Sequence, residues 1–272
     1  MIRFSSQGLE FGKKYFPDCT PKIDIMSLSS SIRWTHITVC WKYESMEELF
    51  DLICLTKHLQ AQGKIVSLYL PYIPNARMDR VKSVNEVFTL KHFCDVINSL
   101  EFEKVTVVDP HSDVSPALLN RVSILSNEDV LQFAVNSILE ETGKTPYLFF
   151  PDAGAAKRYG SNATNGLVAG YANKNRDWAT GEIKGLEICG DIPKDNPILI
   201  VDDICSYGGT FYHTSKKLKE CGADQIYLCV THCENSILKG KLLGDDGPIK
   251  RVFTTNSLFS ETHPKISVRE II

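Results

Sequence analysis

Short apolar runs alternate with helix-like segments along most of this chain, and this alternation constrains the fold more than any other feature. Between the runs, apolar residues recur at helical spacing, for example at Leu90, Phe93 and Ile97. Such alternation is typical of βαβ units, whose parallel strands are buried on both faces. The runs rich in β-branched or aromatic residues, which we predict to be strands, are residues 65–70, 105–108, 147–150, 167–169, 197–201 and 226–230.

The number of expected strands predicts two doubly wound α/β domains. The chain has 272 residues, and a domain commonly holds about 100–200. We assign residues 1–130 to the first domain and 131–272 to the second, with a boundary region near 126–145. A helix capped by Asn127 and ended by Gly143 is expected to bridge them. Residues 181–190 (GEIKGLEICG) are predicted to form a hairpin that turns at Lys184 and Gly185.

Composition excludes several classes of partner. The net charge of −3 provides no global field that would attract nucleic acid or an anionic membrane. No apolar run approaches the roughly 20 residues that span a bilayer. Nine cysteines without a short-spaced framework indicate free thiols in a reducing cytoplasm. Cys229, His232 and Cys233 lack a second ligand pair nearby, so we do not expect them to bind zinc.

The most informative segment for function is residues 197–210 (PILIVDDICSYGGT). An apolar strand is expected to end at the paired acids Asp202 and Asp203, and a glycine loop leads to a helix starting near Thr210. Backbone N–H groups of such a loop and helix terminus can bind a phosphate group. Carboxylates repel phosphate, so we expect the two acids to face ribose hydroxyls or magnesium.

This segment resembles the phosphoribosyl-pyrophosphate loop of the type I phosphoribosyltransferase fold. The resemblance implies a sugar-phosphate site in the second domain, made of Asp202, Asp203, Ser206, Tyr207, Gly208, Gly209 and Thr210. One branch of this family consumes the pyrophosphate sugar, and the other, the phosphoribosyl-pyrophosphate synthetases, makes it.

Residues 71–80 (PYIPNARMDR) favour the synthetase branch. They resemble its ATP-binding loop, which commonly reads Pro-Tyr-x-x-x-Ala-Arg-Gln-Asp-Arg. The resemblance implies that Arg77, Met78, Asp79 and Arg80 contact ATP, although Met78 stands where the family has glutamine. Phe16 and Asp18, in a weaker match near the amino end, would stack on adenine and accept from its amino group.

Two further segments imply a magnesium site. His111 in the sequence Asp-Pro-His resembles the histidine of the family's Asp-Leu-His motif. From residue chemistry alone, a structural histidine is the better interpretation, because Mg²⁺ prefers oxygen ligands. Residues 150–158 (FPDAGAAKR) resemble a segment in which Asp152 would be the second metal ligand or hold its waters.

Residues 171–176 (YANKNR) align with the mobile catalytic loop of the synthetases. Lys174 and Arg176 would neutralise charge on the transferred group, which is the main catalytic device in phosphoryl transfer. The alternative interpretation of this segment is an exposed charged turn.

Together the motifs imply a cytoplasmic, Mg²⁺-dependent enzyme that transfers the pyrophosphoryl group of ATP to the anomeric hydroxyl of ribose 5-phosphate and releases AMP. The phosphate loop departs from the family at two positions: Ser206 replaces an acid and Tyr207 replaces a small hydroxyl residue. Because Tyr207 offers a face for a second ring, ADP-ribose is an alternative acceptor, and its product would serve NAD resynthesis.

Two rival functions differ from a synthetase. One is a phosphoribosyltransferase, which would use the pyrophosphate sugar without needing ATP, and the second is a non-catalytic synthetase-associated subunit. Such a subunit is expected to have lost catalytic or metal-binding residues, yet His111, Asp152, Lys174 and Arg176 are all present. The resemblance also implies a homo-oligomer with the ATP site near a subunit interface.

Overall fold

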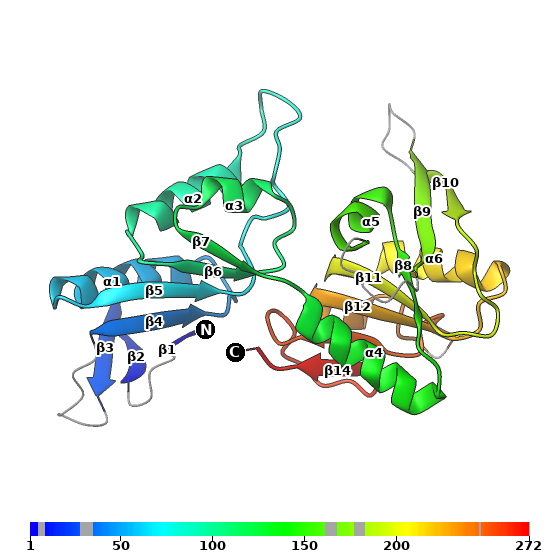
Figure 1. Cartoon of the computed structure of the whole chain (residues 1–272). Helices are drawn as coiled ribbons and strands as arrows, with labels where there is room; N and C mark the ends of the chain where they lie inside the picture. The colour runs from blue at the N-terminus through cyan, green and yellow to red at the C-terminus, as the bar shows by residue number, and fades with distance from the viewer. Residues whose placement is uncertain (5–8, 28–34, 161–167, 177–182, 245, 272) are drawn as a thin grey trace. The chain divides into compact units, whose positions relative to one another are not determined.

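The computed structural model describes residues 1–4, 9–27, 35–160, 168–176, 183–244 and 246–271. The chain divides into two compact units, residues 1–126 and 127–271 (Figure 1). Each unit is an α/β structure with its own sheet, as the sequence predicts. The helix expected to bridge the two domains, α4 (Glu128–Thr142), belongs wholly to the second unit, and Gly143 ends it with a left-handed φ of 71°.

Unit 1 contains a five-stranded sheet in the order β1-β4-β5-β6-β7, and a separate hairpin formed by β2 and β3. Strands β4 to β7 are parallel, and β1 pairs antiparallel with β4. The elements are β1 (Ile2–Phe4), β2 (Leu9–Tyr15), β3 (Pro21–Ser27), β4 (His36–Trp41), α1 (Glu48–Ala61), β5 (Ile65–Leu70), α2 (Thr89–Ser99), β6 (Val105–Val108), α3 (Val114–Leu118) and β7 (Val122–Leu125).

One hydrophobic core joins α1 and α2 to the central strands of unit 1. Leu52 from α1, Leu68 from β5 and Phe93 from α2 are all buried in it. Along β5, buried residues alternate with half-buried ones. The expectation that this run is buried on both faces was therefore wrong, because Ser67 and Tyr69 lie on its less covered face.

Unit 2 contains a seven-stranded sheet in the order β10-β9-β8-β11-β12-β13-β14, parallel except for the β9–β10 pair. Its elements are α4, β8 (Tyr147–Phe150), α5 (Ala153–Tyr159), β9 (Val168–Arg176), β10 (Ile183–Cys189), β11 (Ile198–Cys205), α6 (Gly209–Glu220), β12 (Ile226–Cys233), the 3₁₀ helix η1 (Asn235–Lys239), β13 (Val252–Thr255) and β14 (Ile266–Arg269).

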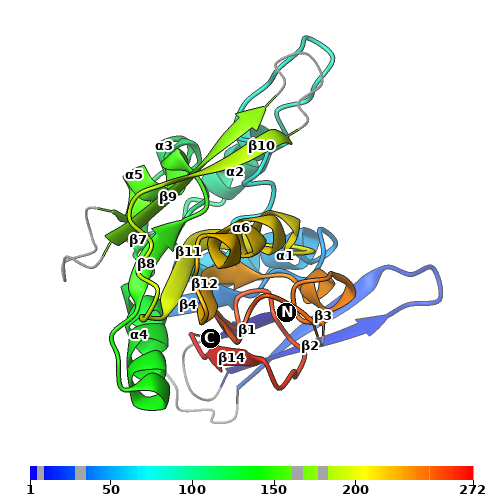
Figure 2. The same cartoon turned by 90° about the vertical axis from the view of Figure 1, so that its right-hand side faces the viewer.

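The helices of unit 2 cover both faces of its sheet. Phe211 and Leu218 of α6 pack with Ile198 and Ile200 of β11 in one core cluster. On the opposite face, α4 and α5 pack with the alternate residues of β11 in a second cluster, so the unit is doubly wound (Figure 2). All eight residues of β12 are buried, as expected for a strand covered on both faces.

Two details of unit 2 correct the sequence analysis. Lys184 and Gly185 lie inside β10 at a register shift, so the predicted turn there was wrong, and Gly181 and Glu182 lie outside the described residues. Strand β11 continues past the acid pair to Cys205, because its ladder with β12 extends through Ile204 and Cys205.

Candidate active site

The carboxyl ends of adjacent parallel strands in unit 2 bring the predicted sugar-phosphate residues together. Strands β8, β11 and β12 run parallel and are neighbours in the sheet. The segments that follow them therefore emerge at one edge, which is where open α/β sheets bind ligands. They supply Asp152 after β8, the Asp202–Thr210 segment at the end of β11, and Glu234 directly after β12.

The two acids of β11 occupy different environments. Asp203 is 2% exposed, and its Oδ1 forms an ion pair with Nη1 of Arg158 from α5 at 3.2 Å. Asp202 is half-buried, and its Oδ1 accepts from the backbone N–H of Asp203 at 3.0 Å. The cation from α5 thus compensates one carboxylate of the pair directly.

Burial and like-charged neighbours raise the pKa of Asp202. Burial contributes most, and the negative charges of Asp203 and Asp152 add to it, so that the pKa of Asp202 rises to about 8. A carboxyl group with this pKa can carry a proton at neutral pH. The neighbouring negative charges of Asp202, Asp203 and Asp152 favour a nearby cation, although these three side chains do not form a metal site by themselves.

Asp152 has a local structural role. It is the N-cap of α5, and its Oδ1 accepts from the backbone N–H of Ala155 at 2.9 Å. Gly154 lies close beside it, since a Cβ at this position would come within 3.2 Å of Asp152 Oδ1. The cap fixes the carboxylate at the edge of the sheet.

The loop between β11 and α6 has the form expected of a phosphate loop. Gly208 takes a left-handed φ of 77° and forms the N-cap of α6 without a side-chain cap. Helix α6 starts at Gly209, one residue before the position predicted from the sequence. The Tyr207 side chain is 60% exposed, whereas Thr210 is half-buried. Uncapped N–H groups at such a terminus favour an anion.

Sequence reasoning missed Glu234, which lies against this loop. Ser206 Oγ donates to Glu234 Oε2 at 2.7 Å, and Ser236 Oγ donates to the same oxygen at 2.9 Å. The replacement of an acid by Ser206 was expected to remove a negative charge from the loop. A carboxylate from the end of the next strand stands beside Ser206 instead. No local sequence signal reveals this contact, because it depends on the register in which β11 pairs with β12.

Lys174 and Arg176 lie in β9 rather than in the expected loop. Their backbone pairs with Leu186 and Ile183 of β10. Because β9 runs parallel to β8, its carboxyl end points to the same edge as Asp152. The side chains of Lys174 and Arg176 lie outside the described part of the structure.

The zinc ligands considered for unit 2 point to different surroundings. Cys229 and Cys233 belong to separate core clusters, and His232 Nδ1 hydrogen-bonds with Ser257 Oγ at 2.8 Å. Across the described ranges, no three His, Cys, Asp or Glu side chains gather in a way that could hold a metal ion. Any Mg²⁺ there would depend on substrate oxygens for much of its coordination.

In unit 1, the carboxyl ends of β5 and β6 bring two of the predicted motifs to one edge. The 71–80 loop follows β5, and Asp109 to His111 follow β6. The backbone N–H of Val108 donates to Pro71 O at 3.2 Å, which links the starts of the two segments. Asn75 and Asp109 hold positive φ values of 64° and 41°. Such conformations are uncommon for non-glycine residues, although Asn and Asp adopt them more readily than most.

The side chains of the 71–80 loop differ in their packing. Met78 is half-buried against the hydrophobic core of unit 1. Arg80 is largely exposed, and its Nε donates to Asp79 Oδ1 at 3.2 Å. Arg77 is exposed as well, whereas His111 in the neighbouring segment is half-buried. The loop therefore combines an apolar anchor with exposed guanidinium groups.

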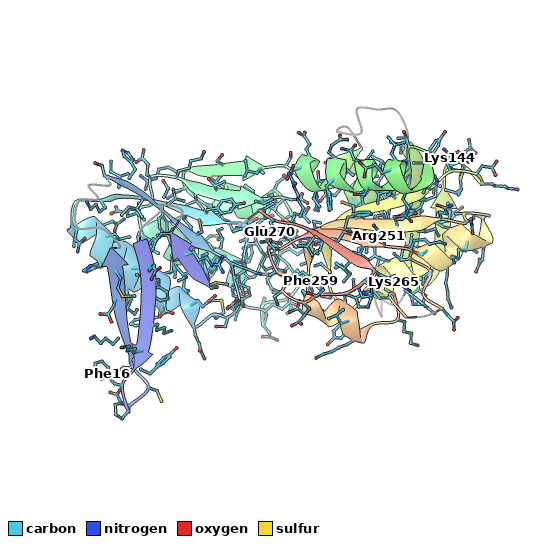
Figure 3. The ribbon with its side chains drawn as sticks, turned by 90° about the horizontal axis from the view of Figure 1, so that it is seen from below. Phe16, Lys144, Arg251, Phe259, Lys265 and Glu270 are labelled. Atoms are coloured by element: carbon cyan, nitrogen blue, oxygen red, sulfur yellow. The ribbon has the colours of Figure 1, made fainter. Side chains whose placement is uncertain are left out.

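Phe16 and Asp18 lie in the turn of the β2–β3 hairpin, with Phe16 at its tip (Figure 3). The Phe16 ring is 53% exposed. Asp18 Oδ1 accepts from the Thr20 hydroxyl and from the Thr20 backbone N–H, and these bonds hold the pKa of Asp18 below its usual value. The turn thus presents an aromatic ring beside an ionised carboxylate.

Known proteins similar to this chain include ribose-phosphate pyrophosphokinases that align with most of it, although no family model matches the chain. A ribose-phosphate pyrophosphokinase from Listeria ivanovii is 26% identical over 268 residues, covering 92% of this chain and 79% of the relative. Another from Saccharolobus solfataricus is 25% identical over 224 residues, covering 80% of this chain and 75% of the relative.

A solved structure confirms the predicted fold. The phosphoribosylpyrophosphate synthetase from Mycobacterium smegmatis matches 97% of this chain and 86% of its own chain, with a TM-score of 0.75 and 19% sequence identity. The fold is therefore the type I phosphoribosyltransferase fold. Among the described residues, every helix is too short or too polar to cross a membrane.

Proposed function

We propose that this chain, a homologue of the ribose-phosphate pyrophosphokinases, transfers the β,γ-pyrophosphoryl group of ATP to the anomeric hydroxyl of ribose 5-phosphate and releases AMP. The observation that carries the proposal is the extent of the similarity, which covers 92% of the chain and therefore both units. A phosphoribosyltransferase would give the 71–80 loop and His111 no task.

Unit 2 would bind the sugar. The loop from Ser206 to Thr210 would hold the 5-phosphate through its backbone N–H groups and the amino end of α6. Asp202 and Asp203 would hold the ribose hydroxyls. Asp203, paired with Arg158, would accept a hydrogen bond, whereas Asp202 can carry a proton at neutral pH and donate one.

Unit 1 would bind the nucleotide. Arg77 and Arg80 would contact the phosphates of ATP or stack on its adenine, and Met78 and Asp79 would line the same loop. Phe16 and Asp18 would reach an adenine from the hairpin, which agrees with the exposure of the Phe16 ring. If that adenine belongs to a neighbouring copy, the enzyme would be a homo-oligomer.

His111 and Asp152 would hold Mg²⁺. The carboxylates of Asp152, Asp202 and Asp203 in unit 2 supply the oxygen atoms that Mg²⁺ prefers, and substrate oxygens would complete its coordination. When bound, Mg²⁺ would neutralise charge on the phosphate oxygens of ATP. All nine cysteines lie in the described residues and none of them forms a disulfide, which supports a reducing compartment such as the cytoplasm.

The reaction would depend on positioning and electrostatics rather than on a covalent intermediate. The anomeric hydroxyl attacks the β-phosphorus in line and loses its proton to solvent, the bond between the β-phosphorus and the α,β-bridging oxygen breaks, and AMP leaves with that oxygen. Lys174 and Arg176 would offset the charge that develops on the transferred group.

A second acceptor, ADP-ribose, is favoured by one observation. Tyr207 lies in the phosphate loop with 60% of its side chain exposed, and an exposed ring can stack on a second base. The product would be ADP-ribose pyrophosphate, which could serve in NAD resynthesis.

Release of AMP from ATP, measured with each acceptor in turn and with or without a chelator, tests these proposals. We expect AMP only with an acceptor and only with Mg²⁺. A chain that forms no AMP with either acceptor would be a transferase or a non-catalytic subunit.

A further inference from the structure

Glu234 lies outside every motif that points to the proposed reaction, yet its carboxylate contacts the phosphate loop. Its Oε2 accepts from Ser206 Oγ at 2.7 Å, and its backbone N–H donates to Cys205 O at 2.8 Å. Both contacts hold the start of the loop, where β11 ends. Glu234 is half-buried, so water screens these contacts only in part.

The rest of the loop packs against the segment that follows Glu234. A Cβ added to Gly240 would lie 2.0 Å from the carbonyl oxygen of Tyr207, so the two backbones are in close contact. A Cβ on Gly208 would lie 2.9 Å from Leu242 Cδ2. Glu234, Gly240 and Leu242 thus contact the loop from one segment of the chain, and Glu234 provides a polar contact with a charged group.

The negative charge of Glu234 can affect phosphate binding by the loop in two opposite ways. A carboxylate near a phosphate site weakens anion binding by repulsion. A carboxylate that fixes the loop strengthens binding, because the N–H groups are already aligned when the phosphate arrives. The Ser206 hydroxyl donates its one proton to Glu234, which ties the Ser206 side chain to the protein rather than to the ligand.

We propose that Glu234 is a positioning residue that holds the Ser206–Gly209 loop in its phosphate-binding conformation. The proposal rests on the proposed function and adds to it a residue that acts on acceptor binding and not on ATP. A hydrogen bond to a charged group has the strength needed for this role.

The test compares steady-state kinetics of the full chain and three variants, with ribose 5-phosphate and ADP-ribose each varied against saturating ATP. Glu234→Ala removes the acceptor oxygen, and we expect the KM of the preferred acceptor to rise roughly tenfold or more, with the KM of ATP unchanged. Glu234→Gln keeps a neutral acceptor oxygen and should stay within about threefold of the wild type. Glu220→Ala removes an exposed carboxylate in the last turn of α6, where it bonds to Lys217 away from the loop, and should leave both constants unchanged.

Ser206→Ala provides a second route to the same contact. It should raise the acceptor KM as Glu234→Ala does. The double variant Ser206→Ala/Glu234→Ala should have an acceptor KM no higher than that of either single variant, because both substitutions remove the same hydrogen bond. Thermal unfolding shows whether each variant folds. If Glu234→Ala does not fold, the acceptor KM values of Glu234→Gln and Ser206→Ala test the proposal in its place.

The outcomes separate the two proposals. An unchanged acceptor KM in Glu234→Ala, with an active wild type, overturns the role of Glu234 and leaves the function standing. A lower KM in both Glu234→Ala and Glu234→Gln also overturns it, because repulsion then dominates. A wild type that neither forms AMP nor binds ribose 5-phosphate in calorimetric titration overturns the function, and the role of Glu234 with it.

Discussion

Asp202 and Asp203 are adjacent residues whose different surroundings give them different chemistry. Asp203 is buried and paired with Arg158, whereas the pKa of Asp202 is raised to about 8 by burial and neighbouring carboxylates. A pair with this asymmetry can both accept a hydrogen bond from a ribose hydroxyl and donate one to it. The sequence predicts the pair, but the asymmetry depends on Arg158 and Asp152, which come from another strand and helix.

The raised pKa of Asp202 predicts a pH dependence of stability. The folded chain keeps a proton that the unfolded chain releases above the ordinary aspartate pKa of 3.8, so the free energy of unfolding falls as pH rises toward about 8. The slope is up to about 1.4 kcal/mol per pH unit. We expect Asp202→Asn to remove this contribution, so that the variant exceeds the wild type in stability most at pH 8 and least at pH 4. Urea unfolding across this range checks it, and parallel curves for the two proteins would contradict it.

Substitution by alanine is expected to affect stability differently at the two adjacent glycines of the phosphate loop. Gly208 has a φ of 77° and a close neighbour in Leu242, so Gly208→Ala should cost about 1–2 kcal/mol of stability. Gly209 begins α6 with nothing within 4 Å of an added Cβ, so Gly209→Ala should leave stability unchanged or raise it by up to about 1 kcal/mol. Equal losses of unfolding free energy in the two variants would argue against the loop conformation described above.

At the level of single elements, β9 places the proposed cationic residues in a strand of an antiparallel pair. Its backbone pairs with β10 through Arg176, the last residue of the strand. The expected mobile loop was inferred from charge and motif order, and neither records that the next segment returns as a partner strand. The two strands are neighbours in the sequence, with Arg176 paired to Ile183, but a motif interpreted as a charged loop does not report the pairing of its backbone.

Replacement of Lys174 tests the catalytic role proposed for β9. We expect Lys174→Ala to lower kcat more than tenfold, because a cation that offsets developing charge is removed, with little change in thermal unfolding. Lys219→Ala, an exposed lysine in the last turn of α6, is the matched control and should leave kcat unchanged. Full activity in Lys174→Ala would remove the catalytic assignment of β9.

The β2–β3 hairpin is anchored to α1 by one ion pair. Lys13 Nζ lies 2.6 Å from Asp51 Oδ2, and Asp51 is 3% exposed. Lys13→Ala leaves a buried carboxylate without its cation and should cost up to about 3 kcal/mol, less than for a fully buried pair because Lys13 is partly exposed. Adding Asp51→Leu should recover most of this loss. Urea unfolding of the single and double variants measures it, and a double variant as unstable as Lys13→Ala would contradict the explanation.

Most elements could be predicted from the sequence because their periodicity is strong. The buried run at Ile198–Val201 and the helix ended by Gly143 are local signals, and both appear in the structure. The end of β11 and the contact of Ser206 with Glu234 could not be predicted. They depend on pairing with β12, and the two residues of that contact are 28 positions apart in the chain.

At the scale of the whole molecule, two α/β units each gather part of the proposed machinery at the carboxyl edge of their own sheet. Unit 1 contributes the 71–80 loop and His111, and unit 2 contributes the acids and the phosphate loop. Curated relatives that align with both units are named ribose-phosphate pyrophosphokinases. A reaction between ATP and a phosphorylated sugar gives each unit a substrate to bind.

The most direct test of this claim follows the transferred group itself. The full chain would be incubated with Mg²⁺, a 5-phosphorylated ribose and ATP that carries ¹⁸O in its γ-phosphoryl oxygens, and the products would be separated and weighed by mass spectrometry. Our account predicts unlabelled AMP and a sugar that has gained two phosphoryl groups together with the label. Labelled orthophosphate with ADP, or an unmodified sugar, would contradict it.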